Sequence, residues 1–237
     1  MEQIKKEMKD YWSRRVDAFS AQRCREFQSP KHDLWLAEFA KYLPRDKALR
    51  ILDIGTGTGF FASLLSGIGH YVVGIDLTDG MIAEAKRKQA QYGWHAEFHV
   101  MDAEKMTFPE QSFDAIVTRN LTWTLPHLPE AYRHWRQFLK EGSVLINFDA
   151  DYCHEQPCHD LPPQHAHESL DEEMKTAYER MKDELRQDCL RPAWDKELLG
   201  QAGFSQIYVD TDVWQRMYAV KDEFYNPTPI FTIVAKA

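Results

Sequence analysis

The sequence predicts an α/β protein built on a doubly wound, mostly parallel sheet. From Ile51 onward, apolar runs rich in β-branched residues alternate with segments of helical spacing. Buried parallel strands joined by right-handed helical crossovers produce this alternation. We expect the strands in "LRILDI", "HYVVGID", "AEFHVMD", "FDAIVTRN" and "SVLINFDA".

The connecting helices and the last strands follow from local signals. Thr78 or Asp79 can cap the helix in "DGMIAEAKRKQAQYG", and Gly93 ends it. A second helix, "EAYRHWRQFL", runs toward Gly142. The last two strands, "FSQIYVD" and "IFTIVAKA", are separated by a segment without a convincing helical pattern, which favours a closing antiparallel pair.

Length and composition predict one domain with appendages. The chain has 237 residues, of which 43% are hydrophobic and 13% aromatic, enough for one sizeable core. We expect a helical cap in residues 1–45, the core in 46–150, an inserted lid in 151–193 and a closing helix and strands in 194–237. Lids over ligand sites commonly come from such insertions and N-terminal helices.

The charge balance argues against polyanionic partners. The net charge is −8 and the pI about 5.7, so neither nucleic acid nor an anionic membrane is expected to attract the protein. The first residues, "MEQIKKEMKDYWSRR", lack the apolar core of a signal peptide, and no apolar stretch is long enough to span a bilayer. Without a signal peptide, we interpret the four cysteines as reduced thiols. We therefore predict a cytoplasmic protein.

The stretch "ILDIGTGTGF" predicts a nucleotide-type site. Ligands of open α/β sheets bind beyond the carboxyl ends of the strands, where the strand order reverses. Gly55, Gly57 and Gly59 can adopt positive φ and let a ligand approach the main chain. The third glycine of a dinucleotide fingerprint is replaced by Phe60, and the lysine and hydroxyl of a phosphate loop are missing. This argues against NAD, FAD and a phosphate site.

Two acids downstream suggest recognition of adenosine. Asp76, at the end of the second strand, can accept hydrogen bonds from both hydroxyls of a ribose. Asp102 ends the next strand and can accept a hydrogen bond from an adenine amine.

Four segments in this order, "LDIGTGTGFFA", "VVGIDLTDGMIAEAK", "MDAEKMTFPEQSFDAIVTRN" and "WRQFLKEGSVLINFD", resemble the motifs of class I S-adenosylmethionine-dependent methyltransferases of the small-molecule type 11 group. The closing "LLGQAGFSQIYV" resembles that family's last helix and strand. The resemblance implies a Rossmann-like, seven-stranded sheet with one antiparallel strand, S-adenosylmethionine as cofactor and S-adenosylhomocysteine as product. The cofactor residues it implies are Asp53, Gly55, Thr56, Gly57, Gly59, Asp76, Leu77, Met81, Asp102, Ala103 and Asn120.

The chain departs from related patterns at two places. Glu141-Gly142 stands where many relatives have Pro-Gly, and Gly142 keeps that turn feasible. The fourth strand ends in "RNLTW" rather than in the Asn-Pro-Pro-aromatic tetrad of methyltransferases that act on adenine or glutamine amides. The acceptor is therefore expected to be a small molecule rather than DNA or a release factor.

Methyl transfer from a sulfonium is an in-line displacement with a neutral leaving group, so alignment of the reactants can supply most of the catalysis. A general base is needed only where the acceptor must lose a proton. Side chains expected to line an acceptor cavity, suited to a flat or cationic acceptor, are Tyr11, Trp12, Phe19, Arg119, Trp123, Trp214 and Tyr225. Most of these aromatic residues are equally compatible with ordinary core packing.

Two polar residues near the expected cavity have alternative interpretations. His127 is the candidate general base, although a surface histidine at a helix start fits it better. Arg119 could pair with an acceptor carboxylate, or serve as scaffolding by binding Asp102 or Asp149.

The Cys- and His-rich segment from Cys153 to His167 matches no defined zinc spacing, so no metal is expected. The sequence thus favours an enzyme that methylates a small molecule. A non-catalytic S-adenosylmethionine-binding regulator or partner subunit remains the alternative, and a nicotinamide oxidoreductase is a third interpretation. No pattern in the sequence indicates the oligomeric state.

Overall fold

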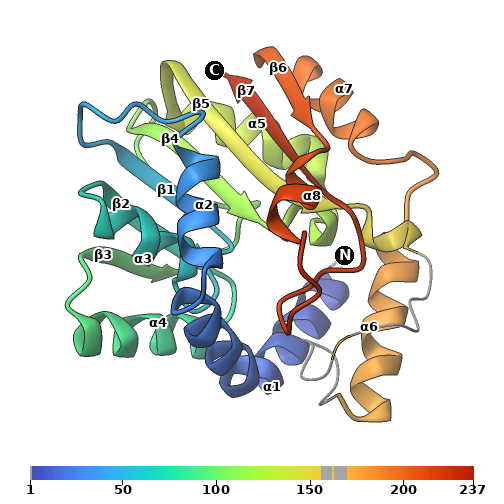
Figure 1. Ribbon diagram of the computed structural model, residues 1–237. Coiled ribbons are helices and arrows are strands. Elements are labelled where there is room, and N and C mark those ends of the chain that lie inside the picture. Colours follow the sequence, from blue (N-terminus) through green and yellow to red (C-terminus); the bar gives the residue numbers. More distant parts are fainter. Residues whose placement is uncertain (1, 156–161, 163–169) are drawn as a thin grey trace.

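A computed structural model describes residues 2–155, 162 and 170–237 of the chain. Its seven-stranded sheet has the order β3-β2-β1-β4-β5-β7-β6 (Figure 1). β7 runs antiparallel to both of its neighbours, and the other pairs are parallel. The strands are β1 (Arg50–Ile54), β2 (Tyr71–Asp76), β3 (Ala96–Val100), β4 (Phe113–Arg119), β5 (Leu139–Ala150), β6 (Ser205–Asp210) and β7 (Ile230–Lys236). This confirms the predicted doubly wound sheet with one antiparallel strand.

Helices cover both faces of the sheet (Figure 1). They are α1 (Glu2–Phe27), α2 (Lys31–Phe39), α3 (Phe60–Gly67), α4 (Asp79–Tyr92), α5 (Leu128–Phe138), α6 (Glu172–Leu185), α7 (Ala193–Gln201) and α8 (Val213–Met217). Successive strand residues enter opposite cores: Ile51 packs with α2, α3 and α4, whereas Leu52 packs with α5 and α7. None of the described helices has both the length and the apolar character that a membrane crossing requires.

One strand boundary and one additional helix differ from the sequence prediction. β5 begins at Leu139 rather than at Ser143, because Leu139 already pairs with Phe113 before the register shifts. A short helix, α8, lies in the segment between the last two strands, where no helix was expected. Val213 and Met217 are both buried and one helical turn apart, so tertiary packing defines this single turn better than local sequence does.

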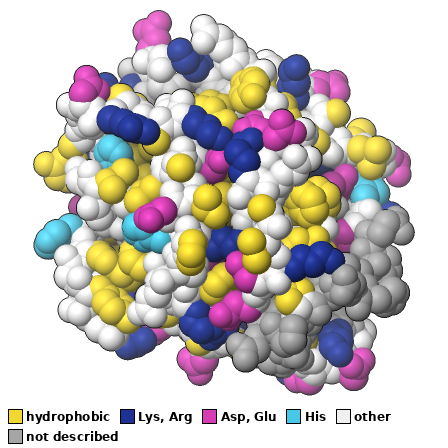
Figure 2. Space-filling view, viewed as in Figure 1, with side chains coloured by type: hydrophobic (Ala, Val, Ile, Leu, Met, Phe, Trp, Pro, Cys, Tyr) yellow, Lys and Arg dark blue, Asp and Glu magenta, His cyan; other side chains and the backbone are white. Residues whose placement is uncertain are grey.

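The N-terminal helix α1 lies across the carboxyl edge of the sheet and packs against α4 and α6 (Figure 1). Its buried side chains include the charged residues Lys5, Arg15 and Glu26 as well as apolar ones. A helix that buries charge on its inner face covers a polar site rather than a dry core. On the face shown in Figure 2, basic and acidic side chains are interspersed with apolar ones.

Candidate functional site

A cavity of about 770 Å³ lies at the carboxyl edge of the sheet, between the ends of β1, β2 and β4 and the inner face of α1. The sheet order reverses between β1 and β4, so the cavity occupies the topological switch point. Its walls combine the glycine turn after β1, the ends of β2 and β4, α6 and the segment before β7.

The glycine turn has the bare main chain that the sequence predicted. Gly55, Gly57 and Gly59 have φ values of +71°, +54° and +83°. A Cβ atom at Gly55 would lie 2.9 Å from Leu121 Cδ1, and one at Gly57 would lie 3.1 Å from Phe19 Cε1. A side chain at either position is therefore disfavoured by the positive φ and would crowd a neighbouring side chain.

Asp53, on β1, stabilises this turn by accepting hydrogen bonds. Its side chain is 2% exposed and accepts hydrogen bonds from Thr56 Oγ1 at 2.6 Å and from the Ala62 amide at 3.1 Å. Burial raises the pKa of Asp53 to about 7. The carboxyl group can thus change its protonation state near neutral pH.

Asp76 fixes the turn from the neighbouring strand. Its two carboxylate oxygens accept one hydrogen bond each, from the Gly57 amide at 3.0 Å and from the Thr78 amide at 2.8 Å. A carboxylate has about four acceptor positions, so these two amides leave acceptor capacity for a ribose hydroxyl. Burial raises the pKa of Asp76, although hydrogen bonds from the two amides and from the Thr78 side chain oppose this shift.

Asp102 meets α1 at the far end of the cavity. Its Oδ2 lies 2.6 Å from Lys5 Nζ, and its Oδ1 accepts a hydrogen bond from the Glu104 amide at 2.9 Å. Lys5 also pairs with Glu104, so this lysine ties the start of α1 to the segment after β3. The buried side chain of Met81 supplies an apolar surface nearby in the same lining.

Most of the predicted site residues line the cavity. They are Asp53, Gly55, Thr56, Gly57, Asp76, Leu77, Met81, Asp102, Ala103 and Asn120 of the cofactor set, and Trp12, Phe19, Arg119, Trp123 and Tyr225 of the acceptor set. The donors and acceptors present fit S-adenosylmethionine: a bare turn, a carboxylate with spare acceptor positions, and an apolar surface followed by a second carboxylate.

Four predicted residues do not line it. Gly59 begins α3, where a Cβ would lie 3.0 Å from a ring atom of Phe98. Tyr11 is 4% exposed and stacks on Tyr178. Trp214 donates its Nε1 hydrogen to the Asn226 carbonyl.

The fourth is His127, the candidate base, which is exposed at the start of α5 and whose backbone amide donates to Glu104 Oε1. The structure places it at the surface, outside the cavity lining.

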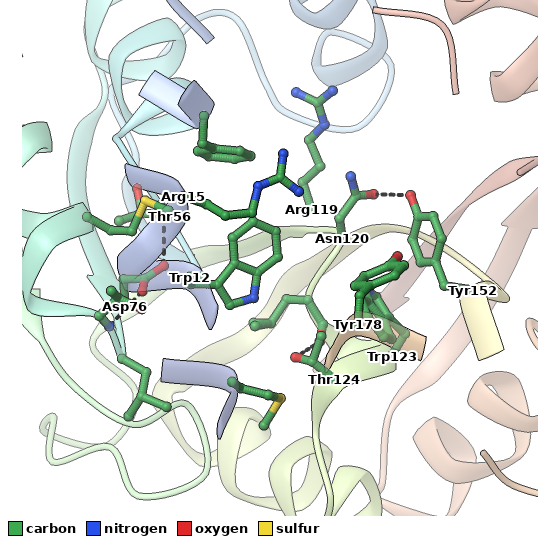
Figure 3. Close-up of a pocket in the computed structure, with 18 of the residues that line it drawn as sticks. Trp12, Arg15, Thr56, Asp76, Arg119, Asn120, Trp123, Thr124, Tyr152 and Tyr178 are labelled. Carbon is green, nitrogen blue, oxygen red and sulfur yellow. Dashed lines mark hydrogen bonds between the residues drawn. The ribbon is translucent and has the colours of Figure 1, made fainter. Parts of the chain in front are cut away.

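The part of the cavity where the sequence predicts the acceptor is aromatic (Figure 3). The ring of Trp123 lies 5.3 Å from that of Tyr152 and 5.7 Å from that of Tyr178. Tyr152 donates a hydrogen bond to Asn120 Oδ1 at 3.0 Å and accepts one from Asn226 Nδ2 at 2.7 Å. Asn120 itself has a φ of +53°, a conformation that aims its side chain from the end of β4 toward this ring cluster.

Arg119 has an internal partner that was not expected. Its Nη2 lies 2.9 Å from Oε1 of Glu26, which α1 supplies, whereas both proposed scaffolding partners are occupied elsewhere. Asp102 binds Lys5, and Asp149 binds Arg191.

Sequence reasoning missed several lining residues, chiefly on α1 and α6. Those on α1 recur every three or four positions, so helical periodicity was a usable signal. Tyr152 and Tyr178 carried no such signal, because they reach the cavity from a turn after β5 and from α6. The missed residues used below are Lys5, Arg15, Arg23, Tyr152, Tyr178 and Lys182. Among the described residues no group of three or more histidine, cysteine, aspartate or glutamate side chains could hold a metal, and most of the Cys153 to His167 segment lies outside the described part of the chain.

The sheet order, the glycine turn and the acids after β2 and β3 define the class I methyltransferase fold. Residues 51–142 match the methyltransferase domain family, and this match supports the resemblance of the chain to the class I S-adenosylmethionine-dependent methyltransferases.

Relatives and solved structures agree with this assignment. The chain is 32% identical to phosphoethanolamine N-methyltransferase 1 of Zea mays over 120 residues, which are 49% of this chain and 23% of the maize enzyme. It is 29% identical to a malonyl-[acyl-carrier protein] O-methyltransferase of Paenibacillus over 201 residues, covering 79% and 69% of the two chains. The structure of Haemonchus contortus phosphoethanolamine N-methyltransferase 2 in complex with S-adenosyl-L-methionine superposes with a TM-score of 0.61 at 19% identity, over 85% of this chain and 51% of that one. The chain spans about a quarter of the length of the plant phosphoethanolamine methyltransferases that it matches.

Proposed function

We propose that the protein transfers the methyl group of S-adenosylmethionine to a small-molecule acceptor. The observation that carries this proposal is one continuous cavity that runs from the glycine turn and Asp76 to the rings of Trp123, Tyr152 and Tyr178. The acceptors in the relatives' names differ, a phosphobase in one and a malonyl thioester in the other, so neither is transferred to this chain.

When bound, the cofactor supplies an electrophilic methyl group on a sulfonium. The protein's own residues bind and orient: Asp53 and Asp76 hold the turn, and α1 with α6 excludes water from the far side of the cavity. No histidine is found among the described residues that line the cavity. We assign most of the catalysis to alignment of the reactants in this cavity.

The test is a calorimetric titration with S-adenosylhomocysteine, followed by a methyl-transfer screen with labelled S-adenosylmethionine. We expect binding and turnover of at least one small acceptor. Binding without turnover across a broad acceptor panel would favour the non-catalytic alternative. Failure to bind either nucleoside, or binding of NAD(H) instead, would remove the proposed activity.

A further inference from the structure

At one wall of the cavity, three charged side chains carry two positive charges and one negative charge. Glu26 accepts hydrogen bonds from Arg119 Nη2 at 2.9 Å and from Trp35 Nε1 at 2.9 Å, and it also pairs closely with Arg23. One carboxylate thus serves two guanidinium groups. The Glu26 side chain is 1% exposed, whereas those of Arg119 and Arg23 are 13% and 14% exposed.

The two arginines line the cavity, and Glu26 lies behind them. Arginine stays protonated in proteins, so this wall has one positive charge in excess. Arg119 is held over the face of Trp35 and Arg23 over the face of Phe19, with 4.4 and 4.8 Å between each guanidinium carbon and the ring centroid. These contacts fix the orientation of both groups without supplying a negative charge. Burial and the neighbouring charge of Arg119 lower the pKa of Arg23.

A third guanidinium group, that of Arg15, also lines the cavity (Figure 3). Its Nη1 donates to the Tyr11 hydroxyl at 3.1 Å, and its guanidinium carbon lies 5.8 Å from the ring centroid of Trp12. Its position is thus fixed by two aromatic residues of its own helix, α1.

The acids that line the rest of the cavity already have donors. Asp102 is paired with Lys5, and Asp53 and Asp76 bind the glycine turn. At the opposite end Glu155 and Glu179 share Lys182, and Glu179 is 64% exposed, so solvent screens its charge. Lys5 and Lys182 each serve two carboxylates, whereas at the arginine wall two guanidinium groups share one carboxylate.

We propose that the methyl acceptor carries an oxyanion, a carboxylate or a phosphate, which binds the guanidinium groups of Arg23 and Arg119. This inference rests on the proposed methyl transfer and names the substrate class. Guanidinium forks match the geometry of carboxylate and phosphate oxygens and form strong charge-assisted hydrogen bonds with them. The apolar part of the acceptor packs against Trp12, Trp123 and Tyr178. A purely cationic acceptor, which an aromatic cavity alone would also suit, is repelled by this wall.

The experiment measures binding of four small probes to the protein saturated with S-adenosylhomocysteine. The probes are phenylacetate, benzyl phosphate, phenylacetamide and phenethylammonium. We expect at least one of the two anions to bind tenfold or more tightly than the amide and the ammonium ion. The two anionic arms distinguish a carboxylate acceptor from a phosphate acceptor. Equal affinity of all probes, or no measurable binding of either anion at millimolar concentration, would overturn the proposal.

Two variants and one control locate the effect. Arg119→Gln leaves Glu26 paired with Arg23 and Trp35, so the wall becomes neutral; we expect the anion to lose roughly tenfold or more in affinity while S-adenosylhomocysteine still binds. Glu26→Gln removes the competing carboxylate and is expected to tighten anion binding. Arg133→Gln alters an exposed arginine on α5 and should change neither affinity. Undiminished anion binding by Arg119→Gln would contradict the proposed contact. If the wild-type protein does not bind S-adenosylhomocysteine, that result would instead contradict the proposed function itself.

Discussion

Asp53 is a carboxyl group whose ionisation is coupled to folding. Burial raises its pKa from about 3.8 to about 7, although Thr56 and Ala62 donate hydrogen bonds to it. In the unfolded chain the same group ionises near its ordinary value. The folded state therefore binds more protons between these two values, and its stability falls as the pH rises through this window.

Replacing Asp53 by asparagine removes this pH dependence. The Asp53 contribution is fully present below about pH 4 and is lost by about pH 7, which for a shift of this size amounts to roughly 4 kcal/mol as an upper figure. Asparagine can still accept hydrogen bonds from Thr56 and Ala62 through its carbonyl oxygen. Urea denaturation at several pH values should show that the wild type, relative to Asp53→Asn, loses stability from pH 4 to pH 7. A constant difference between the two proteins would show that Asp53 keeps an ordinary pKa.

Asp76 has a different task, because its remaining acceptor positions face the cavity. Asp76→Ala removes the carboxylate that binds the Gly57 amide and the expected ribose hydroxyls. Each charge-assisted hydrogen bond contributes roughly 1.5–3 kcal/mol, so S-adenosylhomocysteine should bind roughly tenfold to several hundredfold more weakly. Calorimetry measures the change. Asp33→Ala, at an exposed position on α2, is the matched control, and equal affinities of the two variants would exclude Asp76 from the nucleoside site.

Gly57 and Gly67 allow a comparison of the same substitution in two backbone conformations. Gly57 has a φ of +54°, and a Cβ there would lie 3.1 Å from Phe19, whereas a Cβ at Gly67, the last residue of α3, would meet no atom within 4 Å. Gly57→Ala should destabilise the protein by about 1–2 kcal/mol and weaken nucleoside binding. Gly67→Ala should be neutral or stabilising by up to about 1 kcal/mol. Thermal unfolding and calorimetry of both variants test this contrast, which fails if the two behave alike.

At the scale of the elements, local patterns predicted what local interactions determine. The apolar runs of β1 and β2, the glycine turn and the capped helix α4 follow from side-chain period and backbone conformation within about ten residues. The partner of Arg119 depends instead on how α1 crosses the sheet edge, since Glu26 is 93 positions away. A pattern within one segment contains no information about such a pairing, so Asp102 and Asp149 were the wrong partners.

The helix α1 should respond to the cofactor as a unit. It supplies one wall of the cavity, and its start is tied to the cofactor half through the pairing of Lys5 with Asp102. Binding of S-adenosylhomocysteine should therefore slow amide hydrogen exchange in α1, because local opening of the helix exposes the site. Helix α5, which packs on the other face of the sheet, is the internal control. Equal exchange in α1 with and without ligand would remove α1 from the binding site.

At the scale of the whole molecule, the sheet separates two cores that meet only through its strands. The core with α2, α3 and α4 supports the glycine turn, and the core with α5 and α7 supports the end of β4 that carries Asn120. The fold class followed from sequence because alternation of strands and helices is a property of the entire chain. The junction between β5 and α7 could not be predicted, because it depends on buried polar groups that only the completed fold brings together.

Arg191 forms that junction. Its Nη1 lies 3.2 Å from Asp149 at the end of β5, and its Nη2 lies 2.6 Å from Asp195 on α7. Both carboxylates are fully buried, and the Tyr132 hydroxyl also donates to Asp195 at 2.7 Å. One guanidinium group therefore compensates two buried acids that belong to different elements.

Removing this cation should destabilise the whole domain. Arg191→Met keeps much of the side-chain volume but leaves Asp149 and Asp195 without their cation, and breaking a buried ion pair in this way costs roughly 3–5 kcal/mol. Burial already raises the pKa of Asp149, so the loss should become larger as the pH rises and ionisation of Asp149 is enforced. Urea denaturation at acidic and neutral pH measures both effects, with Arg133→Met on the exposed face of α5 as the control. A loss below about 1 kcal/mol, the range of exposed ion pairs, would mean that hydrogen bonds from Thr122 and Tyr132 satisfy the two acids without the arginine.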